Sequence, residues 1–124
     1  MKNLVWIPLI LLLFGFSCED SENPKTDLDL VQLEKEIISL SESVSCTNSG
    51  EWKFTPMGSK ACGGPVRYIA YHQSVEKQFL ALVELYTQQQ KEYNVKNNVV
   101  SDCMMALEPR LVTCEAGKPI LVFK

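Results

Sequence analysis

Four cysteines in the last two thirds of the chain constrain its fold more than any other feature. Such an even set is typical of a small protein of an oxidising compartment, whose core is only moderately stable by packing alone. Two disulfides are therefore expected, and four thiols allow three pairings. We predict Cys46 with Cys62 and Cys103 with Cys114, because each pair encloses a short segment that contains turn residues.

A zinc site is the alternative use of four cysteines, and their spacing argues against it. Successive cysteines are separated by 16, 41 and 11 positions, whereas structural zinc usually takes two cysteines that are two to four residues apart. The only histidine, His72, is adjacent to none of them. No C-x-x-C motif is present to lower the pKa of one thiol. The sequence therefore predicts neither a metal site nor a cofactor.

The beginning of the chain has the pattern of a secretory signal peptide. Met1 and Lys2 give a positively charged start, and residues 4–16 form an almost wholly apolar run. A helix of that length rises only about 20 Å, which is short of the roughly 30 Å hydrocarbon core of a bilayer. The pattern therefore indicates a signal peptide over residues 1–17 rather than a permanent membrane span.

The first cysteine, Cys18, follows small residues in the sequence Gly15-Phe16-Ser17. This stretch resembles a bacterial lipobox, in which the cysteine after the cleavage site carries a lipid. The resemblance implies a lipid anchor on Cys18 and a place in the outer membrane or cell envelope. Gly15 and Ser17 would also suit an ordinary signal peptidase, so plain secretion is the alternative.

A polar stretch after Cys18 separates the leader from the folded part. It begins Glu19-Asp20-Ser21-Glu22 and lacks the apolar residues that would compensate for the entropy lost on ordering. We predict a flexible acidic tether over residues 18–26 and one small domain over residues 27–124. The acidic cluster resembles the export signal of some surface lipoproteins of Bacteroidota, and a solvated linker is the alternative interpretation.

Two segments have the apolar spacing of amphipathic helices. One covers residues 27–44, and the other runs from Ser74, a good N-cap residue, to about Asn94 without Gly or Pro. The stripe of the first helix is too short for a coiled coil, so we expect it to pack on its own domain. Its members are Leu30, Leu33, Ile37, Leu40 and Val44.

The remaining segments have the patterns of short strands. Residues 51–57 and 66–72 alternate in side-chain character, and residues 110–115 and 119–123 flank a turn signal, Glu115-Ala116-Gly117-Lys118. The predicted fold class is therefore α+β, with two main helices, short antiparallel strands, a C-terminal β-hairpin and disulfide staples.

The loop between the first two strands is the predicted binding site. It reads G-S-K-A-C-G-G-P from Gly58 to Pro65, which places a cysteine beside the most flexible and the most restricted residue types. A turn that is required only by a disulfide is the alternative interpretation. The candidate binding residues are Lys60, Gly63, Gly64, Pro65 and Arg67.

The segment from Cys46 to Phe123 resembles a group of small secreted or lipid-anchored bacterial proteins. Their shared pattern is a cysteine, a Trp-containing strand, a G-x-K-A-C-G-G-P-x-x-Y-I-A-Y run, a helix and a C-terminal pair of cysteines before G-K-P. The resemblance implies the exported address and the cysteine framework, and no reaction. The matching positions are Cys46, Trp52, Gly58, Lys60, Cys62, Gly63, Gly64, Pro65, Tyr68, Tyr71, Cys103, Cys114, Gly117 and Pro119.

Composition and motifs favour a non-catalytic binding protein. The formal net charge of −3 gives no reason to expect nucleic acid as a partner. His72 and Ser74 could share one face of a strand, but no G-x-S-x-G motif surrounds the serine. We predict a membrane-anchored module with a protein partner in the envelope or outside the cell. Inhibition of an extracellular hydrolase, and a structural or assembly role through the helix at residues 27–44, are the alternatives.

Overall fold

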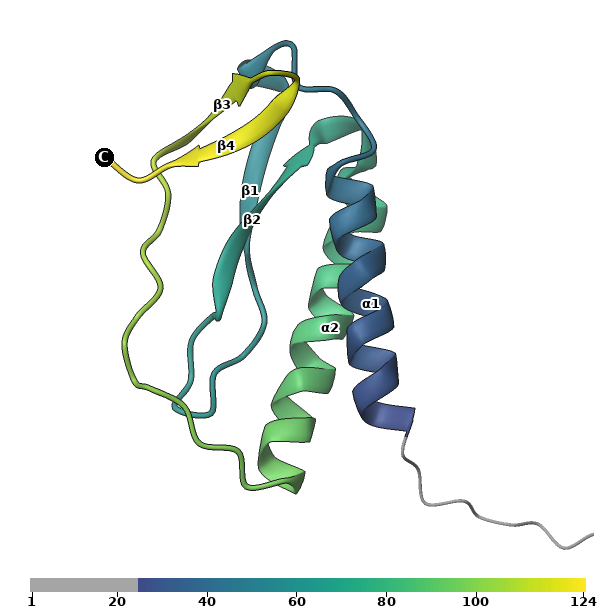
Figure 1. The fold of residues 1–124 in the computed structure, drawn as a ribbon, viewed down its shortest axis with the longest axis vertical. Coiled ribbons are helices and arrows are strands. Elements are labelled where there is room, and N and C mark those ends of the chain that lie inside the picture. The colour runs from purple at the N-terminus through teal and green to yellow at the C-terminus, as the bar shows by residue number, and fades with distance from the viewer. Residues whose placement is uncertain (1–24) are drawn as a thin grey trace, which may run out of the picture.

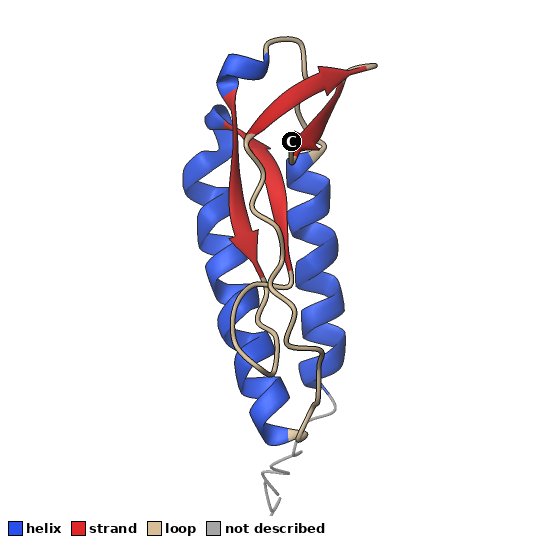
Figure 2. Cartoon of the chain, turned by 90° about the vertical axis from the view of Figure 1, so that its left-hand side faces the viewer, coloured by secondary structure: helices blue, strands red, loops and turns tan. Residues whose placement is uncertain are grey.

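The computed structural model describes residues 25–124, with side chains from residue 29 onward. Two helices pack against one face of a two-stranded ribbon, and a second hairpin crosses the opposite face (Figures 1 and 2). The signal peptide, Cys18 and most of the predicted tether lie outside the described residues. In chain order the elements are α1 (Lys25–Ser41), η1 (Ser49–Glu51), β1 (Trp52–Met57), β2 (Arg67–His72), η2 (Gln73–Val75), α2 (Glu76–Lys96), β3 (Leu111–Glu115) and β4 (Lys118–Val122).

The two helices join through their apolar faces, as the spacing predicts. Ile37 of α1 is fully buried against Phe79 and Val83 of α2, with Leu33 in the same cluster. The stripe of α1 therefore lies in the core of its own domain. The helix ends at Ser41, three residues before the predicted end, and the Ser41 hydroxyl donates to the carbonyl of Ala70 in β2 at 2.5 Å. Within residues 25–124, no helix is both long and apolar enough to cross a membrane.

The ribbon of β1 and β2 separates two apolar clusters. The strands are antiparallel, with Phe54 opposite Ala70 and Pro56 opposite Tyr68. Because successive side chains alternate between faces, Met57 and Tyr71 join the helix cluster, while Trp52 and Ala70 join a cluster beneath the second hairpin. Both predicted strands are therefore confirmed, and each contributes to both layers.

The C-terminal hairpin of β3 and β4 is confirmed, with a two-residue turn at Ala116 and Gly117. Their φ angles are 49° and 76°. Positive φ at both central residues gives the backbone twist that two-residue hairpins require. Val112 of β3 packs in the cluster with Trp52, which fixes the hairpin on the ribbon.

The predicted disulfide pairing is wrong. The bonds are Cys46–Cys114 and Cys62–Cys103, which span 68 and 41 positions. Cys46 precedes β1 and Cys62 follows it, and a six-residue strand places its ends roughly 20 Å apart. The strand β1 therefore separates Cys46 from Cys62, and each of these two is bonded to a cysteine from the C-terminal part of the chain.

Candidate functional site

The loop that follows β1 is attached to α2 at its base. The N–H of Gly58 donates to Oγ1 of Thr87 at 3.0 Å, and the N–H of Ser59 donates to Oε1 of Gln90 at 2.7 Å. Nδ2 of Asn94 donates to the carbonyl of Ser59 at 2.7 Å. Three side chains of one helix face thus hold the start of the loop through its backbone.

The tip of the loop is a tight reversal closed by its own backbone. The N–H of Lys60 donates to the carbonyl of Gly64, and the N–H of Gly63 donates to the carbonyl of Lys60, both at 2.9 Å. Gly63 and Gly64 have φ angles of 97° and 80°, which only glycine adopts readily. A Cβ at either position would meet nothing within 4 Å, so backbone conformation rather than space requires these glycines.

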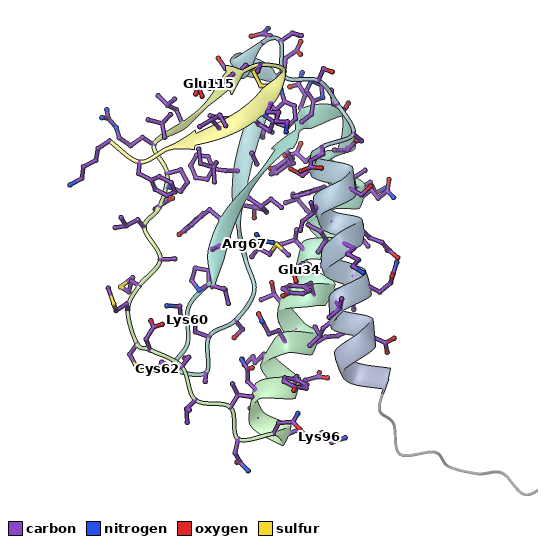
Figure 3. All side chains as sticks on the ribbon, in the orientation of Figure 1. Glu34, Lys60, Cys62, Arg67, Lys96 and Glu115 are labelled. Carbon is purple, nitrogen blue, oxygen red and sulfur yellow. A yellow bond between two sulfur atoms is a disulfide. The ribbon has the colours of Figure 1, made fainter. Side chains whose placement is uncertain are left out.

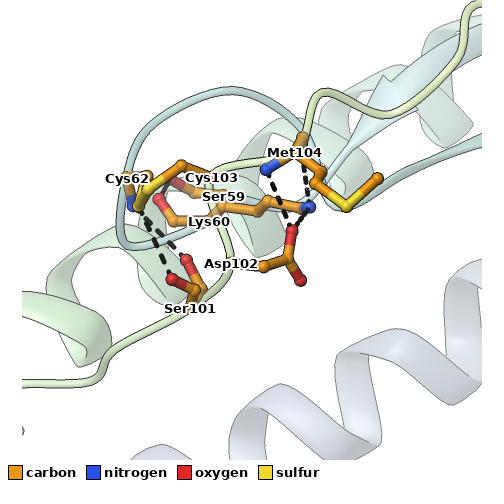
Figure 4. Close-up of a disulfide and its surroundings, with 7 residues drawn as sticks. All are labelled: Ser59, Lys60, Cys62, Ser101, Asp102, Cys103 and Met104. Carbon is orange, nitrogen blue, oxygen red and sulfur yellow. Dashed lines mark hydrogen bonds and ion pairs between the residues drawn. A yellow bond between two sulfur atoms is a disulfide. The ribbon is translucent and has the colours of Figure 1, made fainter.

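A second loop, residues 97–109, lies beside the tip and is joined to it by the Cys62–Cys103 bond (Figure 4). It runs from the end of α2 back to β3, on the side of the ribbon that faces away from the helices (Figures 1 and 2). The N–H of Cys62 also lies 3.4 Å from Oγ of Ser101. We call residues 58–66 and 97–109 together the double loop.

Lys60 links the two halves of the double loop from within. Its Nζ lies 2.7 Å from Oδ1 of Asp102 and 2.6 Å from the carbonyl oxygen of Met104, and its side chain is only 15% exposed. The Lys60 ammonium and the N–H of Met104 both lower the pKa of the Asp102 carboxyl by hydrogen bonding to it. The Lys60 ammonium therefore holds the second loop in place through Asp102 and Met104.

The second loop exposes large apolar side chains to solvent. Val100, Met104, Met105 and Leu107 are 91%, 76%, 90% and 71% exposed. Next to them Ala106 is half-buried and Pro109 is buried. Exposed apolar side chains are ordinary when they are scattered singly. Met104, Met105 and Leu107 fall within four consecutive positions, which makes this segment the candidate interaction surface.

These apolar residues were missed by the sequence analysis, which placed the site on the first loop alone. The signal was the run Met104-Met105-Ala106-Leu107 between two cysteines, which has neither helical nor strand periodicity. An apolar run that belongs to no helix or strand can be exposed to solvent. The run lies beside Cys62 because Cys103 is bonded to Cys62, and the sequence left the pairing of the cysteines open.

Arg67 lies apart from the other candidate residues. It is the first residue of β2, and its Nη2 lies 3.0 Å from Oε1 of Glu34 on α1. Figure 3 shows Arg67 and Glu34 halfway along the molecule, while Lys60 and Cys62 lie toward its lower end. The structure therefore brings Lys60, Gly63 and Gly64 to the second loop, with Pro65 half-buried where the first loop returns to β2.

His72 forms a chain of contacts with Ser74 and Glu51. Its Nδ1 lies 2.7 Å from Oγ of Ser74 and accepts the N–H of Ser74 at 3.1 Å, while its Nε2 lies 3.0 Å from Oε2 of Glu51. Because Nδ1 accepts a backbone N–H, the ring proton belongs on Nε2, where it faces the carboxylate.

This chain of contacts has the composition of a serine hydrolase triad but the geometry of a helix cap. An acyl-transfer site needs free N–H donors for the oxyanion, and the N–H of Ser74 is bonded to His72 while that of Glu76 is bonded to Gln73. The His72 side chain caps η2. The prediction that Ser74 caps the second helix is wrong, because η2 intervenes and Val75 is the N-cap residue of α2, without a side-chain hydrogen bond.

The described residues contain no group of three His, Cys, Asp or Glu side chains that could hold a metal ion. Comparison of the chain with family models, with curated proteins and with solved structures finds no match. Inference about function therefore rests on the geometry of the double loop and on the sequence patterns before it.

Proposed function

We propose that this protein is a non-catalytic, lipid-anchored envelope protein that binds a protein partner through the double loop. The observation that carries the proposal is the exposure of Val100, Met104, Met105 and Leu107 on a segment held by a disulfide and by Lys60. A segment ordered in advance loses little conformational entropy on association, so its contacts contribute more fully to affinity. Apolar side chains on an ordered loop are therefore suited to insertion into a partner.

The proposed address rests on the leader and on the cysteines. The apolar run before Cys18 supports export, and the lipobox-like sequence supports a lipid anchor on that cysteine. Two disulfides agree with an oxidising compartment, where such bonds form and persist. The resemblance to small secreted or lipid-anchored bacterial proteins points in the same direction.

The double loop is a better candidate than the other surfaces considered from the sequence. The apolar stripe of α1, which an assembly role would need, is buried in the core. The contacts of His72 are those of a helix cap, which supports a non-catalytic role. Inhibition of a hydrolase would be a specific form of such partner binding.

The proposal is tested by capture from cell envelopes with the intact lipidated protein and two matched variants. Met105→Glu adds a charge at the exposed loop, and Val31→Glu adds the same charge at an exposed position of α1. We expect a stoichiometric partner that binds the wild type and Val31→Glu and is lost with Met105→Glu. Both variants should keep the thermal unfolding midpoint of the wild type, because neither side chain is buried. A partner that Met105→Glu retains would refute the double loop as the interface.

The address is tested separately by the intact mass of the purified mature protein. We expect a chain that begins at Cys18, carries lipid and contains no free thiol. A mass that includes residues 1–17, or four free thiols, would refute the proposed export and crosslinking.

A further inference from the structure

We propose that the segment Met104–Glu108 enters the substrate cleft of a peptidase as an extended strand, with Met105 in an apolar specificity pocket. The inference rests on the proposed function and names the class of partner.

The backbone of the segment is free to pair. Residues 99–109 belong to no helix or strand, and the segment follows a drawn-out path along the molecule (Figures 1 and 2). Among the described residues, no hydrogen bond involves the N–H or C=O of Met105, Ala106 or Leu107. Exposed main-chain groups of this kind pair readily with a strand edge of another protein, which is how an extended peptide is recognised.

Both ends of the segment are fixed to the body of the protein. On the N-terminal side Cys103 is bonded to Cys62, and Nζ of Lys60 holds the carbonyl of Met104 at 2.6 Å. On the C-terminal side Pro109 is buried, and the N–H of Arg110 donates to the carbonyl of Val122 at 2.7 Å. An extended segment that is fixed at both ends loses little conformational entropy on binding. If a peptidase cleaves it, the two new chain ends stay in place and do not leave the cleft.

The side chains give the segment a defined specificity. Met105 is 90% exposed, so its unbranched apolar side chain can enter a pocket without displacing any part of its own protein. No Lys or Arg lies between Met104 and Glu108. The segment therefore fits a hydrophobic pocket such as that of chymotrypsin and does not fit the acidic pocket of trypsin.

The test measures reversible inhibition of chymotrypsin, subtilisin and trypsin by the full mature protein. We expect inhibition of chymotrypsin or subtilisin without net cleavage, and none of trypsin. Met105→Asp should weaken inhibition about 100-fold, the size of a hot-spot loss. Met105→Arg should transfer inhibition to trypsin. Val31→Asp is the control, because Val31 is exposed on α1 and lies outside the double loop.

Lys60→Ala tests the support of the segment. Without the ammonium behind the Met104 carbonyl, we expect the chain to be cleaved between residues 104 and 108 and to inhibit more weakly. Inhibition of neither chymotrypsin nor subtilisin, rapid cleavage of the wild type, or inhibition unchanged by Met105→Asp would overturn the inference. The proposed function would stand in these cases if envelope capture still depends on Met105. If capture does not depend on Met105, the proposed function falls as well.

Discussion

Lys60 and Asp102 lie 42 positions apart in the chain and form an ion pair with 2.7 Å between Nζ and Oδ1. The pair bridges the two halves of the double loop beside the Cys62–Cys103 bond. The side chain of Lys60 is mostly covered, while that of Asp102 is 66% exposed. The arrangement of the second loop therefore depends on a charge as well as on a covalent bond, and each link can be tested alone.

Acidification should release the ionic link. The folded state lowers the pKa of the Asp102 carboxyl, chiefly because Lys60 donates a hydrogen bond to it. A carboxyl whose folded pKa is lowered adds stability above its unfolded pKa, near 3.8, and that contribution is lost as the pH falls through the folded value. An NMR titration of the Asp102 carboxyl should show its midpoint below 3.8 in the wild type. Lys60→Ala should move the midpoint upward, and equal midpoints in the two proteins would contradict the ion pair.

The two disulfides should differ in their ease of reduction. Cys62 and Cys103 are both exposed, whereas Cys46 is only 3% exposed. Because a reducing thiolate must reach a sulfur atom, mild reductant should open Cys62–Cys103 first. Timed alkylation and peptide mapping would give the order and verify the pairing. Replacing both cysteines of either bond by alanine should lower the free energy of unfolding by about 2–5 kcal/mol. Alkylation of Cys46 before Cys62 and Cys103 would contradict the structure.

Alanine at two loop glycines should have unequal effects. Both have positive φ, so each substitution carries strain of about 1–2 kcal/mol. A Cβ at Gly58 would also lie 2.6 Å from Oε1 of Gln90, whereas a Cβ at Gly63 would meet nothing. Displacing Gln90 would break its bond to the N–H of Ser59. Gly58→Ala should therefore lower the free energy of unfolding by about 1 kcal/mol more than Gly63→Ala. Urea denaturation of both variants checks this, and equal losses would count against the anchoring of the loop base.

His72 should act in folding and not in catalysis. His72→Ala removes the side chain that caps η2 and should cost about 1 kcal/mol in the free energy of unfolding. Ser74→Ala keeps the capped N–H and should cost less. A fluorophosphonate probe, which labels activated serines, should leave Ser74 unmodified in the wild type. Labelling of Ser74 that disappears in His72→Ala would show that the cap interpretation is incomplete.

Most of the local elements of this protein could be predicted from its sequence. The stripe through Leu33 and Ile37 predicted a helix packed on its own domain, and the turn signal over residues 115–118 predicted the hairpin, because helical periodicity and turn conformation depend on residues close in the chain. The four cysteines likewise predicted crosslinking.

Which distant residues meet depends on how the layers pack in three dimensions. The packing of the ribbon between the helices and the second hairpin carried Cys62 away from Cys46 and toward Cys103. The same packing turned Lys60 inward, left Arg67 on α1 with Glu34, and placed Met105 in solvent beside the first loop. These contacts join residues far apart in the chain, and their geometry follows from how the layers pack, which no local pattern of residues specifies.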